Sequence, residues 1–309
     1  MAIDTGEMIW QEYYDAFSYF KKEEVRPPCH PKKLLHRQSS DKAIVLVHGL
    51  TDSPYAMLAI ARYFYEKLGY DVYLPLLQCH GLKDPNGMRG VSLAAWKENV
   101  RFAIDIASSA GARTSIGGLS TGGTLSFYFA NLDTRVNGDL YLFSAAFGLY
   151  GWKGNILTPF IEGFLKLPLI PYCTNSFSLI SDNPYRYSRV PLIAARELVF
   201  LIDENKMLLR KMRQKPVDMK IFSAWSEADR VVRVDLLAGF GTIVSAGYFV
   251  SYVLPLAAQV PHAGVVLENA VYGLDYMPGD PPVETANPHF HLMMESLARF
   301  EGQKSSGWS

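Results

Sequence analysis

The chain contains a serine flanked by glycines in the segment Gly118-Leu119-Ser120-Thr121-Gly122. Residues 113–116 before it can form a strand, and residues 124–130 after it can form a helix. A serine on a tight strand-to-helix turn has a strained backbone, and its neighbours must lack bulk for the strand and helix to approach each other. Gly118 and Gly122 meet this need because glycine has no Cβ. The segment therefore predicts a nucleophile elbow with Ser120 at its apex.

This glycine-rich segment has two alternative interpretations, a turn without chemistry and a phosphate-binding loop. Gly117 and Gly122 have the spacing of the phosphate-binding motif, and Gly123 and Thr124 follow them. That motif requires a lysine where Gly123 stands, so the phosphate-binding loop is excluded. The choice between a plain turn and an elbow depends on whether the rest of the chain supplies partners for Ser120.

The composition excludes several functional classes. Lys plus Arg and Asp plus Glu both number 30 in a chain of 309 residues, so the formal net charge is zero and the basic surface needed for nucleic acid is missing. Cys29, Cys79 and Cys173 are too few and too widely spaced for a disulfide framework or a zinc site, which favours a reducing compartment. The start of the sequence is acidic and has no long apolar run, and no stretch is apolar enough for a transmembrane helix. We therefore expect a cytoplasmic protein without a signal peptide or transmembrane segment.

Strands and helices alternate along most of the chain. Residues 43–47 form a continuous apolar run, which is typical of a strand buried on both faces of a parallel sheet. Further strands are predicted at 71–75, 113–116, 138–144, 217–224 and 248–254, and helices at 55–68, 92–107, 124–130, 191–212, 233–246 and 288–300. This alternation predicts an α/β fold with a mostly parallel central sheet flanked by helices.

Two segments do not follow this alternation. Residues 147–189 are apolar and aromatic but rich in proline and glycine, so we expect an inserted cap without a sheet strand, over the carboxyl edge of the sheet. Residues 1–40 are expected to be an extension packed on the body, which leaves 41–146 and 190–309 as the core. Within the extension, residues 8–20 have aromatic positions at helical spacing. The alternatives are an aromatic helix that binds a lipid surface and a helix packed on the body. The acidic polar face of this helix favours packing on the body.

A serine hydroxyl needs a base to remove its proton, and that base needs a carboxylate to orient it. Asp229 follows one predicted strand and His262 follows the next, so both lie at the same sheet edge as Ser120. The order Ser, Asp, His is the one expected for α/β-hydrolases. Asp229 could instead cap the following helix, and His262 could be an ordinary loop histidine. The rival residues are Asp203, Asp218, His289 and His291. Asp218 lies at the start of a predicted strand and the other three lie within predicted helices, so they are less well placed to reach this edge of the sheet. The sequence predicts a triad of Ser120, His262 and Asp229.

The tetrahedral intermediate of acyl transfer also needs backbone N–H donors for its oxyanion. One donor in the elbow arrangement is the residue after the serine, here Thr121, and the other lies in the loop after an early strand, here Leu50 in His48-Gly49-Leu50. We interpret His48 and His80 as residues that order their loops.

Five segments occur in one order and together resemble the bacterial carboxylesterase and monoacylglycerol lipase group of the α/β-hydrolases. They are His48-Gly49-Leu50-Thr51-Asp52-Ser53-Pro54, Cys79-His80-Gly81, Gly118-Leu119-Ser120-Thr121-Gly122-Gly123, Asp229-Arg230-Val231-Val232 and Pro261-His262. The resemblance spans residues 41–300 and implies a serine esterase with Leu50 and Thr121 as oxyanion donors and a cap over the acyl site. The chain departs from the group at Thr121, where methionine is frequent, and at Cys79 and Ser226, where glycine is usual. Its cap is also longer and more aromatic.

The sequence thus predicts a serine hydrolase that cleaves carboxylic esters and needs no metal or cofactor. Its expected partner is a small ester or lipid-like substrate, and the apolar cap suggests an acyl chain of some length because each buried methylene contributes roughly 0.8 kcal/mol. The alternatives are another activity on the same fold (thioesterase, peptidase or carbon–carbon hydrolase) and a non-catalytic binding protein.

Overall fold

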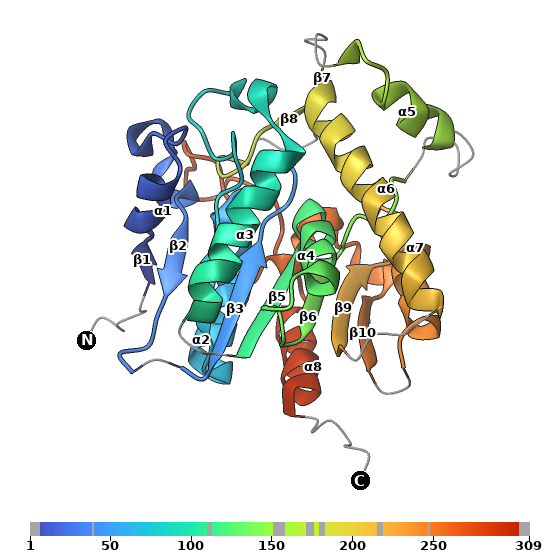
Figure 1. Ribbon diagram of the computed structural model, residues 1–309. Coiled ribbons are helices and arrows are strands. Elements are labelled where there is room, and N and C mark those ends of the chain that lie inside the picture. The colour runs from blue at the N-terminus through green and yellow to red at the C-terminus, as the bar shows by residue number, and fades with distance from the viewer. Residues whose placement is uncertain are drawn as a thin grey trace.

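The computed structural model of the protein describes residues 7–38, 40–109, 113–150, 158–170, 176–178, 183–214, 219–245 and 248–302. Its centre is an eight-stranded sheet with the order β1-β2-β4-β3-β5-β6-β9-β10 (Figure 1). The strands are Glu7–Ile9 (β1), Lys32–Leu34 (β2), Lys42–Val47 (β3), Asp71–Leu74 (β4), Arg113–Leu119 (β5), Leu140–Phe143 (β6), Ile221–Ser226 (β9) and Phe249–Leu254 (β10). Neighbours from β4 to β10 pair in parallel, whereas β1 and β2 pair antiparallel at one edge. The predicted α/β class with a mostly parallel sheet is confirmed.

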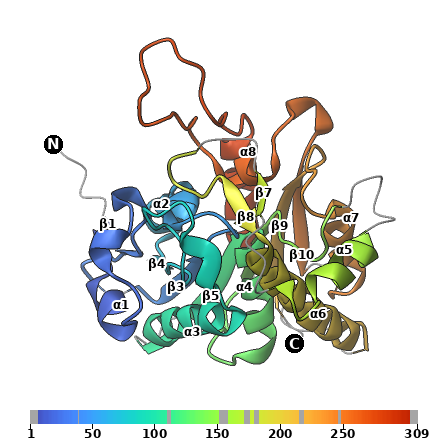
Figure 2. The same cartoon turned by 90° about the horizontal axis from the view of Figure 1, so that it is seen from above.

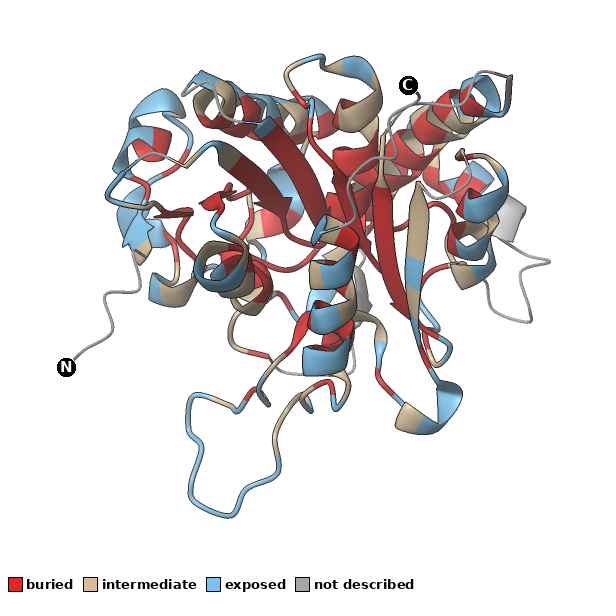
Figure 3. Cartoon of the chain, turned by 90° about the horizontal axis from the view of Figure 1, so that it is seen from below, coloured by how far each residue is buried: buried red, intermediate tan, exposed pale blue. Residues whose placement is uncertain are grey.

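Helices cover both faces of this sheet (Figures 1 and 2). They are Gln11–Ala16 (α1), Leu58–Leu68 (α2), Leu93–Ser109 (α3), Thr121–Leu132 (α4), Thr158–Leu165 (α5), Leu192–Gln214 (α6), Val234–Ala238 (α7) and Phe290–Gly302 (α8). Alternate residues of β3 explain the two layers: Val45 and Val47 pack with α1, α3 and α4, and Ile44 and Leu46 pack with α2 and α8. Both faces of the strand are therefore buried, as its continuous apolar run predicts. Figure 3 shows that most strands at the centre of the sheet consist of buried residues.

The N-terminal segment differs from the single helix expected over residues 8–20. Ile9 belongs to β1, which pairs with β2, and only α1 is helical. Trp10 and Tyr13 are buried against Phe102 of α3, and the Tyr13 hydroxyl donates to the carbonyl of Leu76 at 2.8 Å. These aromatic residues thus pack on the body, and the strand pairing of its first residues shortens the helix.

The segment expected as a cap contains α5 and a strand, Ser176–Ser178 (β7), which pairs antiparallel with Arg189–Pro191 (β8) in a small separate sheet. The expectation that no strand occurs over 147–189 was therefore wrong, because three residues are too few to give a periodic pattern. Leu165 of α5 packs against Leu192 and Val199 of α6, above the carboxyl ends of the strands (Figure 1). Residues 151–157, 171–175 and 179–182 of this segment lie outside the described residues.

The helix expected over 233–246 is also shorter than predicted. α7 ends at Ala238, and a 3-10 turn, Gly239–Thr242, replaces its continuation. Gly239 and Gly241 explain the break, because glycine loses the most backbone entropy in a helix. In the described parts of the chain, no helix is long and apolar enough to cross a membrane.

Candidate active site

Ser120 lies between the last residue of β5 and the first residue of α4. Its backbone has φ 52° and ψ −117°, a conformation that a residue with a side chain rarely adopts. The Ser120 N–H donates to the Phe143 carbonyl at 2.9 Å, and the Ser120 carbonyl accepts the Thr124 N–H at 3.0 Å, so the neighbouring strand and the helix together hold this conformation. Backbone strain of this kind collects at functional sites.

The two flanking glycines are required by close backbone contacts. A Cβ added at Gly122 would lie 2.1 Å from the Val47 carbonyl oxygen, and one added at Gly118 would lie 2.4 Å from the same oxygen. The pairing of Val47 with Gly118 brings β3 and β5 together at this point, and α4 then starts directly above them. These contacts are the steric reason for the glycines of the elbow.

Replacing Gly122 with alanine is expected to lower the free energy of unfolding by at least about 2 kcal/mol, because backbone atoms cannot move aside for the methyl group. Gly163→Ala is the matched control, since no heavy atom lies within 4 Å of a Cβ added at Gly163 in α5. Urea unfolding followed by circular dichroism measures both variants. A Gly122→Ala protein as stable as the parent would show that the turn is not tightly packed.

Asp229 and His262 lie after the carboxyl ends of β9 and β10 and are hydrogen-bonded to each other. The His262 Nδ1 lies 2.6 Å from the Asp229 Oδ2. The other carboxylate oxygen accepts the N–H groups of Val231 at 2.8 Å and Val232 at 3.1 Å, so the carboxylate is fixed on both sides. Burial of Asp229 favours its neutral form, but His262 and these two N–H groups outweigh burial and lower the pKa of the carboxyl. Asp229 is therefore a carboxylate that orients the His262 ring.

The structure brings together Asp229 and His262 and places Ser120 at the same edge of the sheet, after β5. Within the described residues, no hydrogen bond joins the Ser120 hydroxyl to His262. The rival residues have other neighbours: Asp203 forms ion pairs with Lys166 and Lys206, the His289 Nδ1 lies 3.4 Å from the Tyr252 hydroxyl, and the His291 side chain is 78% exposed. Asp218 lies outside the described residues.

Leu50 and Thr121 lie on the two segments next to Ser120. We call residues 48–53 the donor loop. A Cβ added at Gly49 would lie 3.6 Å from the Ser120 Cβ, so this loop packs directly against the serine. Thr121 is the first residue of α4, where a helix leaves backbone N–H groups without partners. In the parts of the chain that the structure describes, the N–H groups of Leu50 and Thr121 donate to no protein acceptor. Both are thus available to a ligand at Ser120.

His48 holds the peptide group that carries the Leu50 N–H. Its Nε2 accepts the Leu77 N–H at 3.1 Å, so the proton must be on Nδ1, which donates to the Gly49 carbonyl at 2.9 Å. That carbonyl and the Leu50 N–H belong to one planar peptide group and point in opposite directions. Burial lowers the pKa of His48 well below its usual value, and the neighbouring His80 adds to this, so the ring stays neutral.

His80 contacts the same loop one residue later. Its Nε2 faces the Leu50 carbonyl and its Nδ1 lies 2.9 Å from the Gln78 carbonyl. Burial lowers the pKa of His80 to about 4, so the ring is neutral near pH 7 and donates to only one of the two carbonyls. Cys79 before it has φ 64°, which explains why glycine is usual at this position in the group that the chain resembles.

Asp52 is a further acidic residue at this site, and the sequence motifs assign no role to it. A Cβ added at Gly49 would lie 2.3 Å from the Asp52 Oδ2, so this carboxylate folds back over the donor loop. The signal in the sequence is its place two residues after Leu50. Across the described residues, no group of three or more His, Cys, Asp or Glu side chains is placed to hold a metal ion.

Comparisons with known proteins support the fold. No protein-family model matches the chain. A stretch of 95 residues is 32% identical to a thermostable monoacylglycerol lipase from Bacillus sp. (strain H-257). This stretch covers 31% of this chain and 37% of that lipase. The matching stretch thus spans little more than a third of the length of this curated relative.

Two solved structures match almost the whole chain. A structure from the study of the metagenome-derived lipolytic enzymes LipS and LipT has a TM-score of 0.66 and 19% identity, and covers 90% of this chain and 100% of its own. A soluble variant of monoglyceride lipase from Saccharomyces cerevisiae, in complex with a substrate analog, has a TM-score of 0.62 and 10% identity, and covers 89% and 93%. At these identities the likeness establishes a common fold, and it confirms the fold implied by the resemblance of the sequence.

Proposed function

The chain has the α/β-hydrolase fold, and we propose that it is a serine hydrolase of carboxylic esters in which Ser120 is the nucleophile, His262 the general base and Asp229 its orienting carboxylate. The observation that carries the proposal is the strained backbone of Ser120 at the tip of the β5–α4 turn. The Asp229–His262 hydrogen bond of 2.6 Å at the same sheet edge supplies a base that is already oriented. The likeness to lipolytic enzymes agrees with this chemistry.

In the proposed reaction, His262 Nε2 takes the Ser120 hydroxyl proton as Oγ bonds to the ester carbonyl carbon. The carbonyl oxygen becomes an oxyanion, which the N–H groups of Leu50 and Thr121 stabilise. The carbon–oxygen bond to the alcohol then breaks, and His262 gives its proton to the leaving alcohol. Water repeats the same steps on the acyl-enzyme, which releases the carboxylic acid and restores Ser120. Asp229 stays ionised throughout and stabilises the charged imidazole.

A buried apolar cluster lies beside the proposed oxyanion donor Leu50. The side chains of Ala146, Leu198, Ile202 and Val232 form a buried cluster, and Leu50 and Leu149 pack against it. The four cluster residues come from the segment after β6, from α6 and from the segment after Asp229, so several parts of the chain meet at this place. We propose that the acyl chain of the substrate packs beside this cluster, under a cap formed by residues 147–189. A monoacylglycerol or a similar long-chain ester fits such a site.

Labelling by a fluorophosphonate probe tests the proposal directly, because the probe reacts only with an activated serine. We expect stoichiometric labelling of Ser120, located by peptide mass spectrometry. In a series of p-nitrophenyl esters from acetate to octanoate, each methylene that packs beside the apolar cluster should raise kcat/KM roughly fourfold, corresponding to about 0.8 kcal/mol. Faster turnover of acyl-CoA thioesters or aminoacyl amides than of matched esters would contradict the ester assignment. Absence of labelling would contradict the serine hydrolase itself.

A further inference from the structure

The segment Asn183-Pro184-Tyr185-Arg186-Tyr187-Ser188, which we call the strap, lies directly against the donor loop. The Tyr187 N–H donates to the Thr51 carbonyl at 3.0 Å, and the Ser53 hydroxyl donates to the Tyr185 carbonyl at 2.9 Å. The rings of Tyr55 and Tyr185 also meet, with centroids 3.7 Å apart. The strap therefore fixes the donor loop from outside through both its backbone and its side chains.

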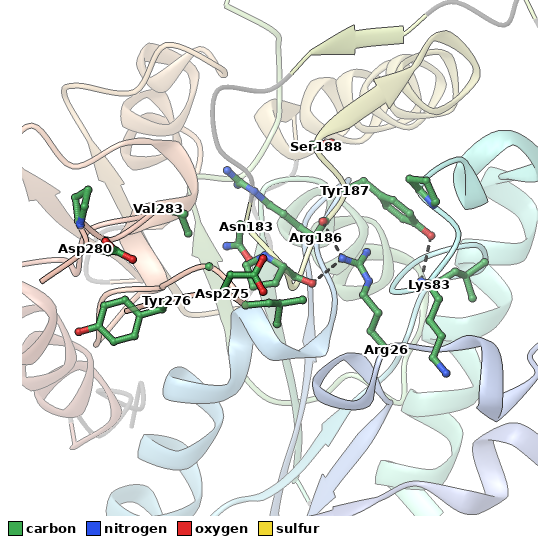
Figure 4. Close-up of a pocket in the computed structure, with 16 residues that line it drawn as sticks. Arg26, Lys83, Asn183, Arg186, Tyr187, Ser188, Asp275, Tyr276, Asp280 and Val283 are labelled. Carbon is green, nitrogen blue, oxygen red and sulfur yellow. Dashed lines mark hydrogen bonds between the residues drawn. The ribbon is translucent and has the colours of Figure 1, made fainter. Parts of the chain in front are cut away.

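The body of the protein holds the other side of the strap. Arg26 donates to the carbonyls of Pro184 at 2.6 Å and Arg186 at 3.1 Å, contacts that Figure 4 draws as dashed lines. The Tyr187 hydroxyl donates to the Cys79 carbonyl at 3.1 Å and accepts the Leu82 N–H at 3.1 Å. The strap is thus anchored on the loop that contains His80, and this contact fixes the position of the strap relative to the sheet.

Arg186 extends from the strap to two carboxylates on different segments. Its guanidinium lies 4.0 Å from the Asp52 Oδ1 in the donor loop, and it forms a short ion pair with Glu284, which also accepts the Asn183 amide at 2.9 Å. The side chains of Arg186, Asp52 and Glu284 are only 14%, 11% and 10% exposed. Two nearly buried carboxylates thus share one guanidinium.

These charges border the turn that carries His262. Asp52, Arg186 and Glu284 line a cavity of only about 10 Å³ together with Ala263, the residue after His262. On its other side, Arg186 lines a larger pocket of about 500 Å³, where Figure 4 shows it beside Arg26 and Asn183. Arg186 therefore connects the loop that bears Leu50 to the surroundings of the catalytic histidine.

The charges of Arg186, Asp52 and Glu284 stabilise this contact between the strap and the donor loop. A carboxylate removed from water is costly unless it is paired. Burial raises the pKa of Asp52, and the Arg186 guanidinium opposes this effect. Without Arg186, Asp52 would lose the cation that opposes the effect of burial, and its carboxylate, which packs against Gly49, would no longer be held toward the strap.

We propose that Arg186 is a positioning residue, which holds the Leu50 N–H against the oxyanion by anchoring Asp52 to the segment of Glu284. This inference rests on the proposed function, and it adds the requirement that Arg186 keep the Leu50 N–H in place. A displacement of one donor by a fraction of an ångström weakens the transition state more than the ground state, because the charge on the carbonyl oxygen develops only during the reaction.

The test uses Arg186→Met, Arg186→Lys, Asp52→Asn and the double variant Arg186→Met/Asp52→Asn. Arg186→Met should lower kcat by roughly 10- to 100-fold, since a misplaced donor costs less than a missing one. The inhibition constant of an alkyl boronic acid, whose tetrahedral adduct occupies the oxyanion site, should rise by a similar factor, while KM changes little. Arg186→Lys should recover part of the loss. The combined loss in the double variant should be clearly smaller than the product of the two separate losses, because both changes break the same connection.

Arg113→Met is the matched control, because Arg113 pairs with Asp139 at 2.8 Å at the start of β5, at the opposite edge of the sheet. A folded Arg186→Met protein with unchanged kcat and boronate inhibition would overturn the inference, as would a lower melting temperature alone. If Arg186→Met does not fold, Asp52→Asn decides in the same way, since it removes the anchor without leaving an unpaired carboxylate in the donor loop. A parent protein that neither hydrolyses esters nor labels at Ser120 would overturn the proposed function as well.

Discussion

Replacing Ser120 with alanine is expected to lower the rate of ester hydrolysis by at least about 10⁴-fold, because the acyl-enzyme cannot form without the hydroxyl. The small activity that remains would come from binding and from oxyanion stabilisation, which do not need the nucleophile. Alanine fits the turn as well as serine does, since the Ser120 side chain forms no hydrogen bond with any of the described residues. The rate is measured with p-nitrophenyl butyrate, and folding is measured by thermal unfolding.

Ser126→Ala is the matched control for this variant. Ser126 lies in the same helix, α4, and its hydroxyl donates to the Gly122 carbonyl at 2.7 Å. This change also removes a hydroxyl from the helix but should leave kcat within about twofold, with at most about 1 kcal/mol lost from stability. Full activity in Ser120→Ala would eliminate Ser120 as the nucleophile. Equal losses in both variants would point to damage to the helix instead.

Replacing Asp229 with asparagine is expected to lower kcat by about 10⁴-fold, with the protein still folded. The asparagine amide has nearly the shape of the carboxylate, but it cannot stabilise the charged His262 ring and can present an N–H to Nδ1, which favours the wrong tautomer. The two N–H groups of Val231 and Val232 still hold the remaining oxygen, so the loop should keep its conformation. Steady-state kinetics with the same ester series measures the loss.

Asp235→Asn is the control, because Asp235 forms an ion pair with Arg233 on the surface and its side chain is 57% exposed. It should change kcat little.

Asp229→Asn should also change the pH dependence of stability relative to the parent protein. The pKa of Asp229 is lowered in the folded protein, so its contribution is present above pH about 4, the ordinary value for an unfolded chain, and is lost as the pH falls further. Asp229→Asn should lack this contribution, and a parent and variant with identical pH profiles below pH 5 would contradict it.

The central part of the fold could be predicted because its signals are local. The apolar run over 43–47 is buried on both faces, and the alternation of strands and helices gives the parallel sheet. Ser120, Asp229 and His262 each follow a strand, and parallel strands end at one edge, so their common location follows from the order of the elements. The chemical role of the three residues remains the proposal that the two variants test.

The short elements could not be predicted in the same way. β1, β2, β7 and β8 have three residues each, which is too few for a periodic pattern, and their pairing depends on partners distant in the chain. The glycines after Ala238 indicate that the helix is weak there. They do not determine whether the chain continues as an α-helix or as a 3-10 turn.

The amino-acid sequence by itself determined the elbow and the edge at which the site forms, because glycines, strand ends and residue order act over a few residues. The tertiary structure decided how the site is held. His48 orients the Leu50 peptide through a hydrogen bond that the sequence does not reveal, and Arg186 meets Asp52 and Glu284 only because the strap folds over the donor loop. Buried charges must be paired at close range, and the chain can bring such partners together from any distance along the sequence. That is why these contacts leave no local pattern.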